Sequence, residues 1–217
     1  MTTIQPTEIV GRAFAIYKQQ AGALIPAALV VFAVVALSEL VFDEGLLVLI
    51  ASAIGIVAHT FYTGMVVRLV DDVRDGVLDA SVSSLFASVA PVALTLILAS
   101  LLVGIGVGIG FILLIIPGLF LMTIWAVVAP VVVLEQRGVI EALGRSQELV
   151  KGNGWGVFGV IVIVFLLTIG AGIVGGALAF AGGDVVRVLV TWAVTVLVAP
   201  LAALATSVLY FALRDQP

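Results

Sequence analysis

Six long apolar runs limit the possible fold more than any other feature of the sequence. Each is close to the length that a helix needs to cross the hydrocarbon core of a bilayer, about 20 apolar residues. The third, fourth and fifth runs contain no charged residue. The runs cover residues 21–42, 46–70, 92–116, 118–134, 155–180 and 185–213.

The composition agrees with a membrane-embedded chain. Of the 217 residues, 63% are hydrophobic and 10% are charged, against about 25% charged residues in ordinary soluble domains. In lipid, backbone groups must bond within a helix or a closed barrel, and the runs lack the alternation of strands. We therefore expect an all-α polytopic membrane bundle of six transmembrane helices, forming a single transmembrane domain over residues 1–217.

The connections between the runs alternate in length. Three are tight turns, and the other two, at about 71–91 and 135–154, are long and charged. This alternation predicts three helical hairpins joined on one side of the membrane. The expected turns are Asp43-Glu44-Gly45, Pro117-Gly118 and Ala181-Gly182-Gly183-Asp184.

The distribution of positive charge predicts the orientation. Lys and Arg near the ends of spans stay on the cytoplasmic side, and eight of the nine cations fall on the side of the termini and the long connections. We expect both termini to be cytoplasmic, in the plasma (cytoplasmic) membrane. The exception is Arg187; the eight are Arg12, Lys18, Arg68, Arg74, Arg137, Arg145, Lys151 and Arg214.

Two segments on that side have the periodicity of amphipathic helices. Residues 8–20 and 138–151 each place apolar side chains on one face and charged ones on the other, which is typical of a helix on a membrane surface. Each carries a Glu–Arg pair with i,i+4 spacing, favourable for an ion pair: Glu8 with Arg12, and Glu141 with Arg145. Residues 81–89 are a weaker third example.

The chain carries a degenerate internal repeat. A shift of 133 residues aligns Glu8 with Glu141, Arg12 with Arg145 and Lys18 with Lys151. Each unit is predicted to be a surface helix followed by a transmembrane hairpin. The units cover about 1–72, 73–136 and 137–217, and the second matches only in outline.

His59 lies near the middle of the second run, with Tyr62 and Thr63 on the same helical face. An ionisable side chain at this depth is a candidate for function. The alternative is a neutral imidazole bonded to a hydroxyl or carbonyl group. An acidic corner is expected near the outer end of the spans, formed by Glu39, Asp43 and Glu44, with Arg187 on the same side. It is either a solvated interface or a vestibule for a cation.

Glycines and prolines within the runs also allow two interpretations. Gly104/Gly108, Gly106/Gly110 and Gly172/Gly176 have the small-xxx-small spacing of closely packed membrane helices, although a flexible helix lining a site has the same pattern. Pro130 and Pro200 are expected to kink their helices. The carbonyls that they free are satisfied by Ser or Thr groups, or bind a proton or ion.

Several function classes are excluded by the residues themselves. Cysteine is absent and there is one histidine, so a His-rich or Cys-based metal site cannot form. Gly-x-Ser-x-Gly and His-Glu-x-x-His motifs are missing. The net charge of −4 leaves no basic stripe for nucleic acid. We expect no enzyme activity and no cofactor.

Motifs in the second half resemble the membrane domain of some bacterial glycerophosphodiester phosphodiesterases and related free-standing multi-pass proteins. The most specific is Arg145-Ser146, Lys151-Gly152 and Trp155. The resemblance covers most of the chain and implies a membrane module. The hydrolytic barrel of those enzymes is absent. Further similar motifs are Ile116-Pro117-Gly118, Ala129-Pro130-Val131, Ala199-Pro200-Leu201 and the opening Glu8-Ile9-Val10-Gly11-Arg12.

These features favour a non-enzymatic multi-pass protein whose partners are membrane lipids or a membrane or cytoplasmic protein. Its contacts with anionic lipid or a partner would be Arg12, Lys18, Arg145 and Lys151. The alternative is a small-solute or ion transporter with its site at His59, Tyr62 and Thr63.

Overall fold

The computed structural model describes residues 4–42, 45–76, 81–180 and 183–216, and in that part every regular element is helical. Six stretches are long and apolar enough to cross a membrane, which confirms a multi-pass all-α fold. The elements are α1 (Pro6–Val41), α2 (Leu47–Arg74), α3 (Val82–Val89), the short 3-10 helix η1 (Ala90–Val92), α4 (Ala93–Leu113), α5 (Ile115–Ile124), α6 (Val128–Glu135), α7 (Val139–Val150), α8 (Gly154–Ala179) and α9 (Asp184–Arg214).

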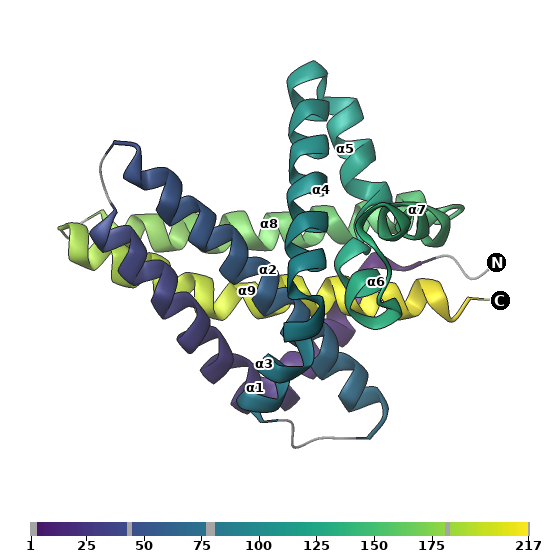
Figure 1. Ribbon diagram of the computed structural model, residues 1–217, viewed down its shortest axis with the longest axis horizontal. Coiled ribbons are helices and arrows are strands. Elements are labelled where there is room, and N and C mark those ends of the chain that lie inside the picture. Colours follow the sequence, from purple (N-terminus) through teal and green to yellow (C-terminus); the bar gives the residue numbers. More distant parts are fainter. Residues whose placement is uncertain (1–3, 43–44, 77–80, 181–182, 217) are drawn as a thin grey trace.

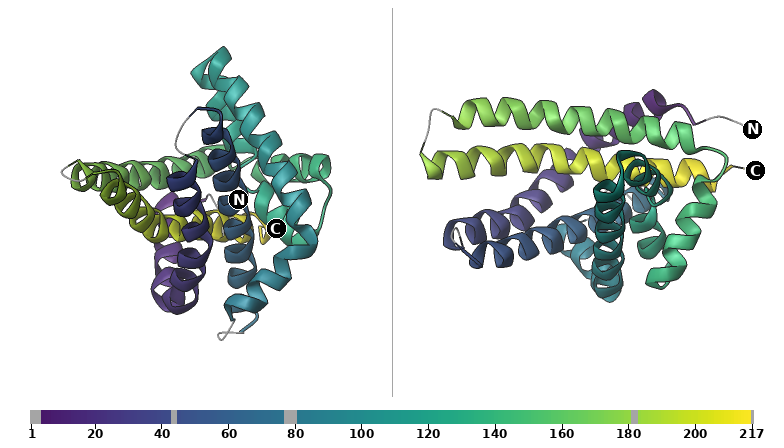
Figure 2. Two further views of the ribbon diagram at one scale, coloured as in Figure 1. Left: turned by 60° about the vertical axis from the view of Figure 1, so that its left-hand side comes forward. Right: turned by 90° about the horizontal axis from the view of Figure 1, so that it is seen from above.

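Three hairpins form the architecture, as the connection lengths predict. α1 packs on α2, α4 on α5, and α8 on α9, and α1 also packs extensively along α9. The hairpins do not run parallel. The α4–α5 hairpin points away from the α8–α9 hairpin, and the ends opposite the termini spread apart (Figures 1 and 2). The expected turns at 43–44 and 181–182 lie outside the described residues.

The expected surface helices are present, and their apolar faces pack against other helices. Residues 6–20 belong to α1 and end at a kink, where Gln20 has non-helical backbone angles of φ −109° and ψ 15°. α3 begins at Ser81, whose hydroxyl accepts the Ser84 N–H. α7 buries one face, represented by Ala142 and Val150, within the protein. The three elements therefore help to hold the hairpins together.

The predicted turn at Pro117-Gly118 is wrong by a few residues. α4 and α5 meet at Leu114, which has an extended backbone (φ −165°, ψ 154°). Pro117 instead falls in the first turn of α5, where its missing N–H removes no helical hydrogen bond. Gly118 approaches α4 closely, because a Cβ built on Gly110 would lie 2.9 Å from the Gly118 Cα.

The fourth span is interrupted rather than merely kinked before Pro130. α5 ends at Ile124 and α6 begins at Val128, because the Pro130 ring cannot fit against the carbonyl four residues earlier in a regular helix. Ser146 of α7 is fully buried at the break. Its hydroxyl donates to the Ile124 carbonyl (2.9 Å) and accepts the Val127 N–H (3.3 Å). A serine thus satisfies freed backbone groups, one of the two outcomes expected. α9, in contrast, continues through Pro200.

Glu135, at the end of α6, is the centre of a polar cluster that joins the ends of the hairpins. Its carboxylate accepts hydrogen bonds from Arg137 Nε (2.7 Å), Arg145 Nε (3.2 Å) and the buried Tyr210 hydroxyl (3.0 Å). Arg145 also donates to Glu148 (3.3 Å). The expected ion pair of Arg145 with Glu141 is therefore not formed, whereas the Glu8–Arg12 pair is confirmed.

A second ion pair ties α2 to the end of α9. Arg74 donates to Asp215 (2.8 Å) and lies 4.0 Å from the ring centroid of Phe211. Burial alone would raise the pKa of Asp215, but hydrogen bonds from Arg74 and Arg214 outweigh burial and hold this pKa below its usual value. Asn153 at the start of α8 donates to Gln216 (2.7 Å). We call this end of the molecule, defined by Glu135, Arg145, Tyr210, Arg74 and Asp215, the basal end.

Substituting Ser146 with alanine tests whether its hydroxyl stabilises the break between α5 and α6. The change leaves the Ile124 carbonyl and the Val127 N–H without their buried partner, which costs about 1–3 kcal/mol. We expect the purified Ser146→Ala protein to unfold at a clearly lower temperature in detergent. Ser88→Ala is the control, because the Ser88 hydroxyl bonds only to Leu85 of its own helix. Equal melting temperatures for the two variants would contradict the assigned role.

Candidate functional site

His59 faces open space between the hairpins. Its ring lies 4.6 Å, centroid to centroid, from the ring of Phe32, which is buried. Thr63 donates to the His59 backbone carbonyl (2.9 Å), and Tyr62 donates to the Leu24 carbonyl (3.1 Å). Within the described residues, the imidazole itself forms no hydrogen bond with the protein. The expected bond of a structural imidazole to a hydroxyl or carbonyl group is therefore not found there.

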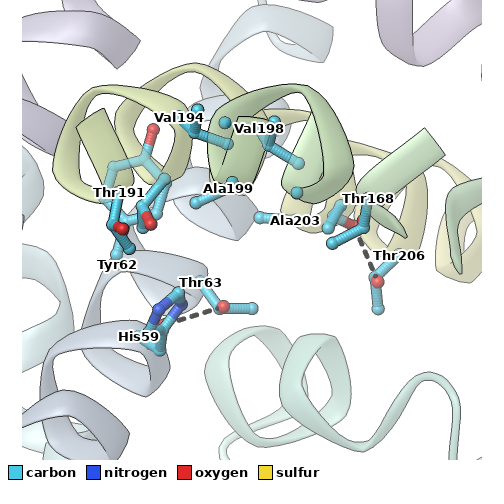
Figure 3. A pocket seen from close by; sticks show the side chains of 15 residues that line it. His59, Tyr62, Thr63, Thr168, Thr191, Val194, Val198, Ala199, Ala203 and Thr206 are labelled. Carbon is cyan, nitrogen blue, oxygen red and sulfur yellow. Dashed lines mark hydrogen bonds between the residues drawn. The ribbon is translucent and has the colours of Figure 1, made fainter. Parts of the chain in front are cut away.

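A cavity of about 410 Å³ lies between α2, α8 and α9, and all three predicted residues line it: His59, Tyr62 and Thr63. Figure 3 shows these side chains of α2 facing a row of α9 side chains across the cavity. The row includes Thr191, Val198 and Thr206, and Thr168 of α8 also lines the cavity.

The threonines give this cavity a surface of hydrogen-bond acceptors. Thr63, Thr168 and Thr206 each donate to a carbonyl four residues earlier in their own helix. Their hydroxyl protons are therefore used, while their oxygen lone pairs can still accept bonds. Thr191 and Thr195, one turn apart on α9, also line the cavity. In the sequence, Thr191, Thr195 and Thr206 recur at spacings that place them on one face of a helix. This spacing alone does not show that the face lines a cavity.

A second cavity, of about 930 Å³, adjoins the first at His59. It lies between α1, α2, α4 and the start of α9, nearer the ends of the hairpins that spread apart. Glu39 and Arg187 both line it, whereas the other two carboxylates of the predicted acidic corner, Asp43 and Glu44, lie outside the described residues. Its other polar lining residues are Ser52, Thr60 and Ser100.

The two cavities share His59 as a lining residue and both lie along α9, and we call them together the interhairpin cleft. The second cavity contacts α9 at Arg187 and Val188, and the first contacts it from Thr191 to Thr206. At 1.5 Å per helical residue, the stretch from Arg187 to Thr206 is about 28 Å long. This length is similar to the thickness of a bilayer's hydrocarbon core, about 30 Å. Beyond Thr206, toward the basal end, the side chains of Leu209 and Tyr210 are buried in the protein core.

The structure separates the glycines by role. Gly106 and Gly110 of α4 pack closely: a Cβ on Gly106 would lie 2.6 Å from Trp125. Gly172 and Gly176 line the first cavity, and a Cβ there would meet nothing within 4 Å. For this pair, the interpretation as close packing is wrong, because Gly175 makes the close approach to α9 instead: a Cβ built on Gly175 would lie 2.8 Å from Val194. Gly172 and Gly176 leave the cleft open.

The four predicted cationic contacts lie apart from the cleft. Arg12 pairs with Glu8 and is well exposed, and Lys18 and Lys151 are exposed. Arg145 is only 29% exposed and is held by Glu135 and Glu148. Burial alone would lower the pKa of the Arg145 guanidinium, but hydrogen bonds with these carboxylates and their negative charges raise it. Among the described residues, no group of three or more His, Asp or Glu side chains could hold a metal ion.

Comparison with protein-family models, curated proteins and solved structures finds no match to this chain. The resemblance to the phosphodiesterase-associated membrane domain therefore stays a prediction.

Thiol labelling of single cysteines measures whether the cleft is open to water. The chain has no native cysteine, so one introduced thiol gives an unambiguous signal. We expect Thr195→Cys, which lines the cavity, to react with a water-soluble methanethiosulfonate reagent in proteoliposomes. Leu197→Cys is the matched control, because Leu197 lies two residues away and is exposed on the outside of the helix. Equal reactivity of the two thiols would contradict an accessible cleft.

Proposed function

We propose that this multi-pass membrane protein is a non-enzymatic binding protein that holds an amphipathic, lipid-like molecule in the interhairpin cleft. The observation that carries the proposal is the position of His59. A polar, ionisable side chain at membrane depth has no hydrogen-bond partner among the described protein groups and lies where two cavities meet. Such a group costs free energy unless a ligand or water satisfies it.

The lining of the cleft matches an amphiphile better than a fully polar solute. The mouth carries the charged residues Glu39 and Arg187, and the wall beside them is formed by apolar side chains such as Ile56, Leu101 and Ile105. Ligand sites of this kind are mostly apolar, with a few polar groups that fix the orientation. An amphiphile could place its polar head group at the charged mouth and its apolar chain along the apolar wall.

The spread of the hairpins gives such a molecule a route of entry. Close to the mouth, large apolar residues are exposed on α2 and α4, including Val48, Ile56 and Ile105. In a bilayer these surfaces contact acyl chains. A lipid can therefore move sideways from the bilayer into the cleft without passing its chain through water.

Three exposed cations outside the cleft support a second lipid contact. Arg12, Lys18 and Lys151 lie in the segments that were predicted to contact anionic lipid, and each adds about 1 kcal/mol of attraction near an anionic surface. Arg145 contributes less to this contact, because two carboxylates already neutralise it. This contact orients the protein in the membrane and is independent of the cleft.

Transport of a small solute is the alternative use of the same cleft. It is favoured by the length of the cleft, which is comparable to the hydrocarbon thickness, and by His59 as a group that can carry a proton. Proton-linked uptake of a solute into proteoliposomes that is lost in His59→Ala, together with no lipid bound in the cleft of the unmodified protein, would support transport over lipid binding.

A large side chain that fills the first cavity should weaken binding of the proposed lipid. We expect Gly176→Phe to place a ring in the first cavity without a clash with backbone, since a Cβ there meets nothing within 4 Å. Native mass spectrometry of delipidated protein titrated with dioleoylphosphatidylcholine should show at least tenfold weaker binding, which is about 1.4 kcal/mol.

The matched control for this experiment is Gly170→Phe. Gly170 lies on the same helix, is exposed, has open space around it and does not line the cleft. It should bind the lipid as the unmodified protein does. Equal binding by both variants would overturn the cleft as the lipid site.

Neutralising the three exposed cations tests the second lipid contact. Arg12→Gln, Lys18→Gln and Lys151→Gln combined should remove about 3 kcal/mol of attraction at an anionic surface. We expect a loss of phosphatidylglycerol enrichment around the protein in nanodiscs, measured by energy transfer to a labelled lipid. Arg145→Gln is the comparison: it should change the enrichment little and lower the melting temperature. Unchanged enrichment in the triple variant would refute the contact.

A further inference from the structure

We infer that the interhairpin cleft selects amphiphiles whose head group carries an ammonium, such as a choline or ethanolamine phospholipid. This inference rests on the proposed function and names the chemistry of its ligand. The mouth of the cleft, where a head group would lie, supplies the observations.

Glu39 provides the negative charge at the mouth. It lines the second cavity in the last turns of α1, and within the described residues it takes part in no salt bridge. Arg187 lines the same mouth and already has an interaction within the protein. Glu39 is exposed at this mouth, and a carboxylate in this position attracts a cation.

An aromatic residue lines the same mouth as the carboxylate. Phe42 follows Glu39 by three residues, lines the same cavity and is only half-buried. An ammonium or quaternary ammonium group over an aromatic face gains about 0.5–2 kcal/mol. A carboxylate and a ring together therefore recognise the charge and the methyl groups of a choline head.

The deeper part of the cleft adds acceptors and no cation. The threonine oxygens line the first cavity, Ser52 and Ser100 line the second, and among the described residues no Lys or Arg lines the first cavity. A zwitterionic head group can place its ammonium at Glu39 and its phosphate toward Arg187, whereas a head group without an ammonium leaves Glu39 without a cation and gains nothing from these acceptors. Zwitterionic and cationic amphiphiles are therefore favoured over anionic ones, and the chain then runs past His59 along α9.

Native mass spectrometry of the full-length protein, titrated with defined lipids, tests the preference. We expect dioleoylphosphatidylcholine to bind about tenfold more tightly than dioleoylphosphatidylglycerol. Glu39→Gln should remove most of this preference while phosphatidylglycerol binding stays the same or improves. Phe42→Leu, which keeps an apolar side chain of similar size, should weaken phosphatidylcholine more than phosphatidylethanolamine.

Glu141→Gln is the matched control. It removes an exposed carboxylate at the basal end, outside the cleft, and should leave the preference unchanged. Choline chloride without an acyl chain should not compete at millimolar concentration, which separates recognition of a lipid from recognition of a free ammonium ion. Competition by free choline would overturn the lipid as the source of the head group.

The outcomes separate this inference from the proposed function. Binding of both lipids that Gly176→Phe weakens, but with no preference between them, would overturn the ammonium head group and keep the cleft as a lipid site. A preference that survives in Glu39→Gln would overturn the role of the carboxylate. Absence of lipid binding at the cleft would overturn both.

Discussion

The carboxylate of Glu135 is the interaction on which the arrangement of the helices depends. It ends α6 and binds side chains from the following loop, from α7 and from α9. Such charge-assisted hydrogen bonds are stronger than neutral ones, and losing one partner of a half-buried group costs more than the bond itself contributes. Together with the Arg74–Asp215 pair, this cluster ties the three hairpins together at the basal end, in addition to the packing of α1 along α9.

Anchoring at one end makes the cleft possible. Hairpins joined at their base and diverging at the other end leave space between them, which a parallel bundle of the same six helices would fill with side chains. The small residues along the wall, Gly172 and Gly176, preserve that space. The charged basal end and the cleft are thus two consequences of one asymmetric attachment, with ion pairs at the base and open volume toward the tips.

Much of the fold follows from the sequence because hydrophobic length and charge are local properties. The six spans, the helices at 8–20, 81–89 and 138–151, and the Glu8–Arg12 pair were predictable from composition and periodicity. The turn at Leu114 and the break before Pro130 were not, because they depend on where α4, α5 and α7 meet. Ser146 looks like an ordinary serine in an amphipathic helix until α7 is placed against the break.

The candidate site was predictable in its residues and not in its shape. His59, Tyr62 and Thr63 lie on one face of one helix, so periodicity brings them together. The threonines of α9 and Glu39 belong to other hairpins, and their position beside His59 depends on the angle between hairpins, which no local pattern encodes. The same limit explains the glycine pairs: identical spacing marks a tight helix contact at Gly106/Gly110 and a cavity wall at Gly172/Gly176.

The interruption of the fourth span has a structural consequence. α6 is buried on most sides and fixed by Glu135, whereas α5 exposes large apolar residues such as Ile116 and Phe120 to the bilayer. Between them, the hydrogen bonds of a regular helix are replaced by two i→i−3 bonds of 3.3 Å, from the Ala126 N–H to Thr123 and from the Val128 N–H to Trp125. The fourth span is therefore two helices with different surroundings, α5 against the bilayer and α6 within the base of the molecule, and the Ser146 hydroxyl of α7 bridges the break between them.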